Sequence, residues 1–214
     1  MSVIAPAITV ETLDEYKVMI EKIKPFAKRV HIDISDGEFA PSFLLGESQL
    51  WWPPEWQVDV HCMVMRPSEH LAALIALKPS MITFHVEIQE DRAALISQIK
   101  AAGIKAGIAL LRSTVPSTVA EIIKLADHVM VFSGDLGKYG GTASLMQLEK
   151  VRLIKAINPN VEIGWDGGVS IDNAYTLAQG GVSVLNSGGA ISKAEDPAEA
   201  YATLTKEINK HGVI

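Results

Sequence analysis

The sequence has one cysteine, Cys62, so no disulfide bond can form within the chain. Its first ten residues, MSVIAPAITV, lack the basic start and the long apolar core of a secretion signal. No apolar stretch approaches the roughly 20 residues that a membrane-spanning helix needs. These absences predict a protein of the reducing cytoplasm, with no membrane segment.

Positive charge is also scarce. The formal net charge is −6, and the Lys and Arg residues form no run. A general nucleic-acid or anionic-membrane partner requires a basic surface, so we expect neither partner. A phosphate ligand would have to be held by local groups rather than by an overall positive field.

What the chain does have is the composition of a soluble globular protein, with 48% apolar and 21% charged residues among 214. It contains no fixed-period repeat, low-complexity segment or linker. We therefore expect residues 1–214 to form a single domain.

Short apolar runs alternate along the chain with longer amphipathic segments, and the runs predict strands. They cover residues 3–8, 29–34, 57–62, 81–86, 104–110, 128–132, 161–165 and 182–186. Several of the amphipathic segments begin at Ser, Thr, Asp or Pro, as helices do. The connection after the second run is irregular, and only a short helix is expected there, around residues 47–51.

This alternation predicts the α/β class, either a closed (β/α)8 TIM barrel or a doubly wound open sheet. The positions of the polar residues favour the barrel, because they fall at the carboxyl ends of the runs, which form the active face of a barrel. These residues are His31, Asp33, His61, His85, Glu87 and Asp166.

Side chains alternate across a strand, so His31 and Asp33 share one face of their run. Together with His61 and Asp166 they offer two imidazoles and two carboxylates, a set suited to zinc, manganese, iron or cobalt. Without a metal ion the carboxylates would repel, and one would stay protonated as a general acid. His61 or His85 taken alone could instead donate to a backbone carbonyl.

Other polar and aromatic residues have simpler interpretations. Asp36 precedes Gly37, which is typical of a turn, and His70 and His128 are expected at the surface. The tryptophans at positions 51, 52 and 56 indicate a binding surface, a subunit contact or packing against the barrel. We expect a homo-oligomer.

Paired glycines form a second pattern, in WDGGVS (165–170) and NSGGAIS (186–192). Such segments either make tight turns or present backbone N–H groups to a phosphate, which barrels often bind after strands seven and eight. A third glycine-rich segment, SGDLGKYGGTAS (133–144), suits a mobile cover whose Lys138 could reach a phosphate.

Taken together, the motifs IAPAI, VHIDISDGEFAPS, DVHCMV, ITFHVE, DGGVS and SGGAI resemble the ribulose-phosphate 3-epimerase family, (β/α)8 enzymes of pentose phosphate metabolism. The resemblance implies one divalent metal ion held by His31, Asp33, His61 and Asp166. It also implies that Asp33 and Asp166 act as base and acid on opposite faces of C3 of a ketose phosphate, through an ene-diolate. The substrate would be D-ribulose 5-phosphate and the product D-xylulose 5-phosphate.

The resemblance further implies a set of residues that bind the substrate and its phosphate. These are His61, Met63, Gly140, Gly141, Gly167, Gly168, Ser187, Gly188 and Gly189.

This chain departs from the family pattern and looks like a diverged member. Ala7 replaces a serine that contacts substrate, and the missing hydrogen bond could come from Thr9. Ser35 replaces a methionine, and the segments after the fifth and sixth strands differ. Another ketopentose or ketohexose phosphate therefore stays open as substrate, as does a barrel that binds a sugar phosphate without turnover.

Two related activities fit less well. A sugar-phosphate lyase would need an Asp-x-Lys-x-x-Asp array, but no lysine lies between Asp33 and Asp36. A phosphoribosyl-anthranilate-type isomerase would need a cysteine at the first strand, whereas Cys62 lies at the third.

Overall fold

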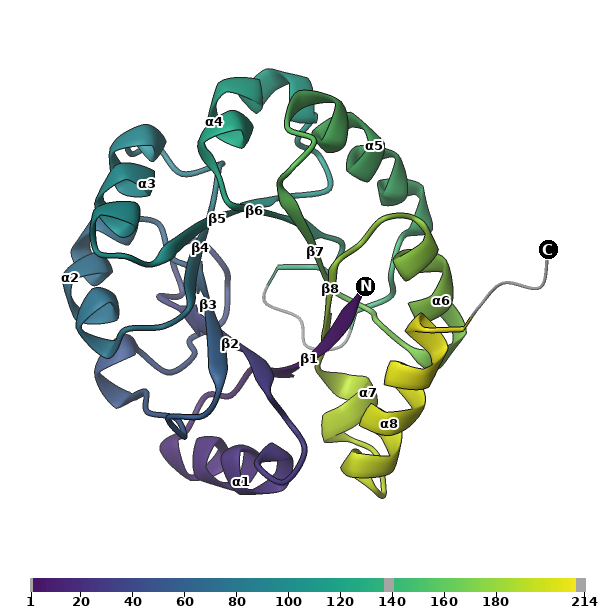
Figure 1. The fold of residues 1–214 in the computed structure, drawn as a ribbon. Helices are drawn as coiled ribbons and strands as arrows, with labels where there is room; N and C mark the ends of the chain where they lie inside the picture. Colours follow the sequence, from purple (N-terminus) through teal and green to yellow (C-terminus); the bar gives the residue numbers. More distant parts are fainter. Residues whose placement is uncertain (1, 137–140, 211–214) are drawn as a thin grey trace.

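The computed structural model describes residues 2–136 and 141–210. Its parallel strands form a closed barrel in chain order, with β1 paired to β8, and the helices surround it (Figure 1). The strands are β1 (Val3–Ile8), β2 (Arg29–Ser35), β3 (Gln57–Met63), β4 (Met81–His85), β5 (Lys105–Leu110), β6 (His128–Phe132), β7 (Glu162–Asp166) and β8 (Val184–Ser187). This closure confirms the (β/α)8 barrel and rules out the open doubly wound sheet.

The helices follow the strands around the ring. They are α1 (Leu13–Ile23), α2 (Pro67–Leu77), α3 (Arg92–Ala101), α4 (Ala120–Leu125), α5 (Leu148–Ile157), α6 (Ile171–Gln179), α7 (Gly189–Ser192) and α8 (Pro197–Ile208). Helix starts follow the sequence signals: Thr12 and Glu15 form a capping box on α1, and Asp91 and Asp196 cap α3 and α8.

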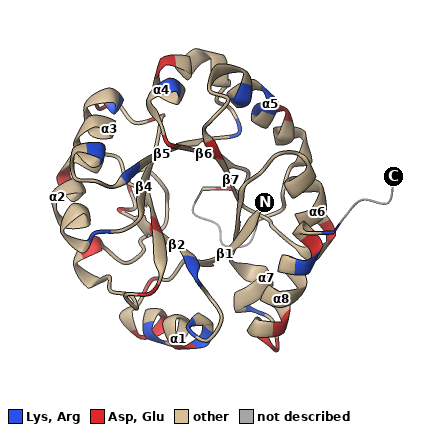
Figure 2. Ribbon diagram, in the orientation of Figure 1, with Lys and Arg blue, Asp and Glu red and all other residues tan. Residues whose placement is uncertain are grey.

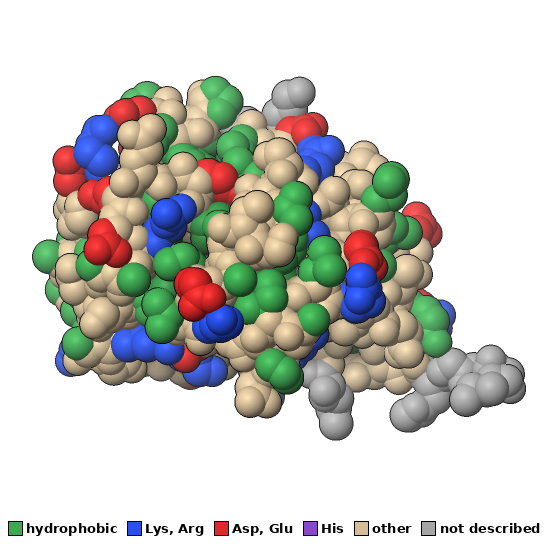
Figure 3. Space-filling view, turned by 90° about the horizontal axis from the view of Figure 1, so that it is seen from above, with side chains coloured by type: hydrophobic (Ala, Val, Ile, Leu, Met, Phe, Trp, Pro, Cys, Tyr) green, Lys and Arg blue, Asp and Glu red, His purple; other side chains and the backbone are tan. Residues whose placement is uncertain are grey.

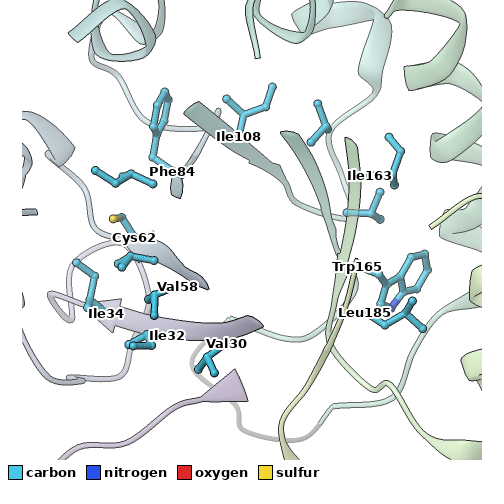
Figure 4. Packing of buried hydrophobic residues seen from close by; sticks show 14 of the residues in the cluster. Val30, Ile32, Ile34, Val58, Cys62, Phe84, Ile108, Ile163, Trp165 and Leu185 are labelled. Carbon is cyan, nitrogen blue, oxygen red and sulfur yellow. The ribbon is translucent and has the colours of Figure 1, made fainter. Parts of the chain in front are cut away.

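Most of the core lies between the strands and the helices. Val30, Ile32 and Ile34 are at most 1% exposed, and they belong to the buried layer shown in Figure 4 with Phe84 and Trp165. The alternate residues of β2, among them His31 and Asp33, point into the barrel instead. The alternation predicted for this strand is therefore confirmed.

The amino-terminal end of the barrel is closed by an ion network. Arg29 donates to both carboxylate oxygens of Glu162, at 2.9 and 2.8 Å, and to Asp59 at 2.6 Å. His128 Nδ1 lies 2.8 Å from Glu162 Oε2 and is 2% exposed. The prediction that His128 lies at the surface is wrong, because its ring points inward beside Glu162.

The connection from β2 to β3 contains a short helix where one was predicted. It is a single 3-10 turn, Glu47–Gln49, within the predicted residues 47–51. Asp36 makes the predicted turn, since its Oδ1 accepts from the backbone N–H groups of Glu38 and Phe39. Another predicted surface residue, His70, is half-buried against Glu47.

The aromatic residues of this connection do not share one environment. Trp56 is buried and Trp51 is 43% exposed. Packing against the barrel therefore holds for Trp56, and the homo-oligomer stays a prediction.

The charged side chains are spread over the helices with both signs mixed (Figure 2), and the face in Figure 3 carries no broad area of one sign. Across the described part of the chain, none of the helices is both long and apolar enough to cross a bilayer.

Candidate active site

The barrel brings together the four side chains that the sequence predicted as metal ligands. His31 and Asp33 come from β2, His61 from β3 and Asp166 from the end of β7. The β2–β3 register places Asp33 directly beside His61. One ligand atom from each of the four lies within 4.8 Å of the others.

The separations within this cluster show which atoms converge. Asp33 Oδ1 lies 2.8 Å from His61 Nδ1 and 3.1 Å from His31 Nε2. Asp166 Oδ2 lies 3.9 Å from each of the same two nitrogens. The converging atoms are therefore His31 Nε2, His61 Nδ1 and one oxygen from each aspartate.

This geometry fits a divalent metal ion. Bonds of about 2.1 Å place neighbouring ligand atoms about 3.0–3.4 Å apart, so the observed separations need only small adjustments. Two imidazoles with two carboxylates suit zinc, iron, manganese or cobalt rather than calcium. The histidines are almost fully buried, and the side chain of Asp166 is 14% exposed, which leaves it open to a ligand.

Burial and nearby charges shift the pKa values of the two carboxylates in opposite directions. Burial alone would raise the pKa of Asp33, but the charge of His31 and hydrogen bonds to His31 and His61 outweigh it and hold that pKa well below its usual range. Burial and the nearby charge of Asp33 raise the pKa of Asp166. Without a metal ion, Asp33 is therefore the more readily ionised of the two carboxylates and Asp166 the more readily protonated.

The pKa values of the two histidines are also shifted in opposite directions. Burial opposes protonation of His31, yet the charge of Asp33 and its hydrogen bond raise the His31 pKa to about 9. Burial lowers the pKa of His61, because the hydrogen bond to Asp33 compensates for only part of the lost hydration. His61 is thus the imidazole more readily available as a neutral metal ligand.

A cavity of about 1000 Å³ opens above the cluster, and both Asp33 and Asp166 line it. It also includes most of the residues predicted to bind substrate and phosphate: Met63, Gly141, Gly167, Gly168, Gly188 and Gly189. His31 and His61 lie beneath it, and Ser187 is buried outside its lining. The predictions for Lys138 and Gly140 lie outside the described residues.

The glycine pair after β7 is required by close packing. Gly167 and Gly168 have φ angles of +101° and +72°. A Cβ atom on Gly167 would lie 2.1 Å from the backbone nitrogen of Gly134, and one on Gly168 would lie 2.0 Å from that of Ala143. The loop after β7 therefore lies directly on the loop after β6, at the edge of the cavity.

Two residues of the cavity were missed or assigned differently from the sequence. Thr9 was expected to contact substrate, but its hydroxyl donates to Asp33 Oδ2 at 2.5 Å. Asn186 is buried on β8 and lines the cavity. It follows the same rule, a polar residue near the carboxyl end of a strand, that identified the other candidates.

The fold and the site thus define a (β/α)8 barrel whose carboxyl-end face carries histidines and aspartates that could hold a metal ion. The profile of a family described as "Ribulose-phosphate 3 epimerase family" matches residues 3–192. The chain belongs to the ribulose-phosphate 3-epimerase family, as its motifs predicted.

Individual relatives agree with this assignment. The chain is 30% identical over 183 residues to the chloroplastic ribulose-5-phosphate-3-epimerase of Arabidopsis thaliana, covering 80% of this chain and 64% of that protein. It is 31% identical over 175 residues to the ribulose-phosphate 3-epimerase of Helicobacter pylori, covering 78% and 80%. The 3-hexulose-6-phosphate synthase of Salmonella typhimurium shares the fold, with a TM-score of 0.70 at 18% identity over 96% of this chain and 98% of that one.

Proposed function

We propose that this protein is a metal-dependent epimerase that inverts C3 of a ketose phosphate, interconverting D-ribulose 5-phosphate and D-xylulose 5-phosphate. One observation carries the proposal. Two carboxylates from β2 and β7, Asp33 and Asp166, line the same cavity over a cluster that can hold a metal ion.

The roles of the two aspartates follow from their positions on separate strands of the ring. One carboxylate removes the proton from C3 of the bound sugar, and the other returns a proton to the opposite face of the planar ene-diolate. The opposite pKa shifts of Asp33 and Asp166 support this division, because a base and an acid are needed in the same turnover. In the reverse reaction the two carboxylates exchange roles.

The metal ligands in this proposal are His31, Asp33, His61 and Asp166. When bound, a divalent ion supplies positive charge beside the ketone oxygen, where negative charge develops. Held by these four residues, its positive charge would also offset the repulsion between the two aspartates.

The phosphate is assigned to the glycine loops after β7 and β8. Gly167, Gly168, Gly188 and Gly189 leave backbone groups accessible at the edge of the cavity. We assign contacts with the sugar or its phosphate also to His61, Met63, Gly141 and Ser187. Local backbone groups suit this task, because the protein as a whole is negative.

A second substrate class is favoured by the walls of the cavity. Ala7 contributes no hydroxyl there, and Ser35 turns its own hydroxyl to the carbonyl of Ser42 at 2.7 Å. The lining also includes Glu11, just before α1, and Asp14 and Glu15 in the first turn of that helix. Another ketopentose or a ketohexose phosphate is therefore the alternative substrate for the same catalytic groups.

The test is turnover in deuterated water. Protein supplied with Zn²⁺, Mn²⁺, Fe²⁺ or Co²⁺ is incubated with D-ribulose 5-phosphate, and the sugars are followed by NMR. We expect deuterium at C3 together with D-xylulose 5-phosphate, and loss of both signals after metal removal by a chelator.

The other outcomes separate the alternatives. Exchange only with a different ketopentose or ketohexose phosphate would change the substrate and keep the mechanism. Loss of carbon from the sugar would indicate a lyase, and binding without exchange would indicate a barrel without turnover.

A further inference from the structure

A line of polar side chains runs from the candidate metal cluster toward the outside of the barrel. His61 Nε2 lies 2.9 Å from His85 Nε2 on β4. His85 Nδ1 in turn lies 3.3 Å from Glu87 Oε2. Both histidines are 0% exposed, so water does not compete for these contacts.

The outer end of this line is fixed in place. Glu87 Oε1 accepts the backbone N–H of Leu111 at 2.9 Å and the hydroxyl of Thr114. The ring of His85 packs between Phe39 and Phe132, with ring centroids 4.7 and 5.5 Å away. Neither Glu87 nor His85 therefore has freedom to turn toward another partner.

The hydrogen atoms along this line are determined by the cluster. His61 faces Asp33 with Nδ1 and His85 with Nε2. If Nδ1 holds a metal ion, that nitrogen carries no hydrogen, so the neutral ring carries its hydrogen on Nε2. His61 then donates to His85 Nε2, and His85 carries its own hydrogen on Nδ1.

On the outer side of that nitrogen lies a carboxylate oxygen of Glu87, 3.3 Å away. Glu87 Oε2 and His85 Nδ1 are buried, and neither makes a hydrogen bond of standard geometry within the described residues. Their separation is only slightly longer than an ideal hydrogen bond. An ionised carboxylate accepts hydrogen bonds and donates none. Glu87 therefore favours one direction of donation along the line, from His61 to His85 and from His85 to Glu87.

We propose that His85 and Glu87 are positioning residues that hold His61 in the orientation and tautomer that expose Nδ1 to a divalent metal ion. This inference rests on the metal centre of the proposed function. His85 and Glu87 touch neither the substrate nor the ion, and they act through His61. Partners of this kind typically contribute tenfold to a hundredfold to metal affinity.

The decisive variant is Glu87→Gln. It keeps the size of the side chain and replaces the carboxylate oxygen that faces His85 Nδ1 with a donor. The Gln carbonyl takes the two donors, Leu111 N–H and the Thr114 hydroxyl, and its NH₂ group then faces His85 Nδ1. His85 must accept there, so its hydrogen moves to Nε2 and is donated to His61. Neutral His61 then carries its hydrogen on Nδ1, the atom required by the metal.

We expect Glu87→Gln to weaken Zn²⁺ binding about tenfold to a hundredfold, measured by competition with a chromophoric chelator at constant pH. Glu87→Asp keeps an ionised acceptor and should retain more of the affinity than Glu87→Gln. If Glu87 served only for packing, the isosteric Gln would retain more Zn²⁺ affinity than the shorter Asp. The opposite order of affinities therefore indicates a positioning role.

The chain offers a matched control at the other end of the barrel. Glu162 lies 2.8 Å from His128 Nδ1, so Glu162→Gln makes the same change to a Glu–His pair without contact to the cluster. We expect Glu162→Gln to leave Zn²⁺ affinity within twofold of the unchanged protein. An equal loss of affinity in both variants would overturn the proposal.

A second measurement needs no variant. In the Zn²⁺-loaded protein, nitrogen-15 NMR of the imidazoles should show hydrogen on Nε2 of His61 and on Nδ1 of His85. Hydrogen on Nδ1 of His61, or unchanged Zn²⁺ affinity in Glu87→Gln, would overturn the positioning role alone. Failure of the unchanged protein to bind any of the four divalent ions would overturn the metal centre as well.

Discussion

At the scale of single residues, the site depends on two aspartates in unequal surroundings. Asp33 accepts hydrogen bonds on both oxygens, from Thr9 on one and from the histidines on the other. Asp166 lies farther from the same histidines, at 3.9 Å, and the charge of Asp33 disfavours its ionisation. Identical side chains thus have pKa values shifted in opposite directions by their surroundings.

We predict that Asp166→Asn lowers kcat at least about a thousandfold, within the range attributed to general acid–base groups. Asn has nearly the same shape but does not carry a proton between solvent and C3. Because Asp33 remains, exchange of the C3 hydrogen with deuterated water should persist for one of the two epimers. NMR of each epimer incubated separately measures this difference.

The control for Asp166→Asn is its fold and its metal content. We expect its free energy of unfolding to change by less than about 1 kcal/mol, since the replaced group is nearly isosteric. Rates like those of the unchanged protein would remove Asp166 from the mechanism. Loss of exchange with both epimers in a fully metal-loaded variant would contradict the division into two separate bases.

Residues of this kind differ in how well the sequence identifies them. His31 and Asp33 were identified because strand alternation is a local property, and two polar residues on one face of an apolar run stand out. Thr9 was not identified as a partner of Asp33, since that contact depends on how far β1 and β2 are offset. Such an offset is set by barrel closure, which no local pattern encodes.

At the scale of elements, the loops after β6 and β7 form one unit at the edge of the cavity. Gly167 packs against Gly134, and Gly168 packs against the backbone of Ala143. The sequence predicted the glycine turns and the phosphate role. It did not predict that these glycines are needed because two loops touch, since that contact joins different parts of the chain.

We predict that Gly168→Ala raises KM for the ketose phosphate about tenfold or more, with a smaller effect on kcat. Its new Cβ would lie 2.0 Å from the nitrogen of Ala143, so the loop after β6 must move. Steady-state kinetics with the identified substrate measures the split between KM and kcat.

Gly103 supplies the matched control for this loop. Its φ is +77°, close to that of Gly168, but a Cβ there meets nothing within 4 Å. Gly103→Ala should therefore cost about 1–2 kcal/mol of backbone strain and leave KM unchanged. Equal KM values in both variants would show that the contact between the two loops does not shape the phosphate end of the site.

At the scale of the whole molecule, the candidate catalytic groups and a stabilising ion network lie at opposite ends of the barrel. The candidate metal cluster lies at the carboxyl ends of the strands. The ion network at the amino ends ties β2, β3, β6 and β7 together, through Arg29, Asp59, His128 and Glu162. The sequence predicted the carboxyl-end cluster, because it concentrates in recognisable motifs. The amino-end network was not predicted, since its members are scattered over four separate runs.

This network makes stability depend on pH in a defined direction. Burial alone would raise the pKa of Glu162, but hydrogen bonds from Arg29 and His128 hold it well below its usual range. A carboxylate whose pKa is lowered by folding stabilises the fold above its unfolded pKa, about 4.3. That contribution decreases as the pH falls below this value, toward the pKa in the folded protein.

We predict that Glu162→Gln lowers the free energy of unfolding by about 3 kcal/mol at pH 7, because it removes one of the two carboxylates that pair with the buried Arg29 and leaves only Asp59. The difference in free energy of unfolding between the two proteins should shrink below about pH 4. There the ionised Glu162 of the unchanged protein stabilises the fold less. Urea unfolding of both proteins at pH 7, 4 and 3 measures this difference.

The control is Glu121→Gln, at an exposed pair with Lys124. Its free energy of unfolding should stay within about 0.5 kcal/mol of the unchanged protein at each pH. A Glu162→Gln deficit that is independent of pH would mean that shape, rather than charge, holds this end of the barrel closed.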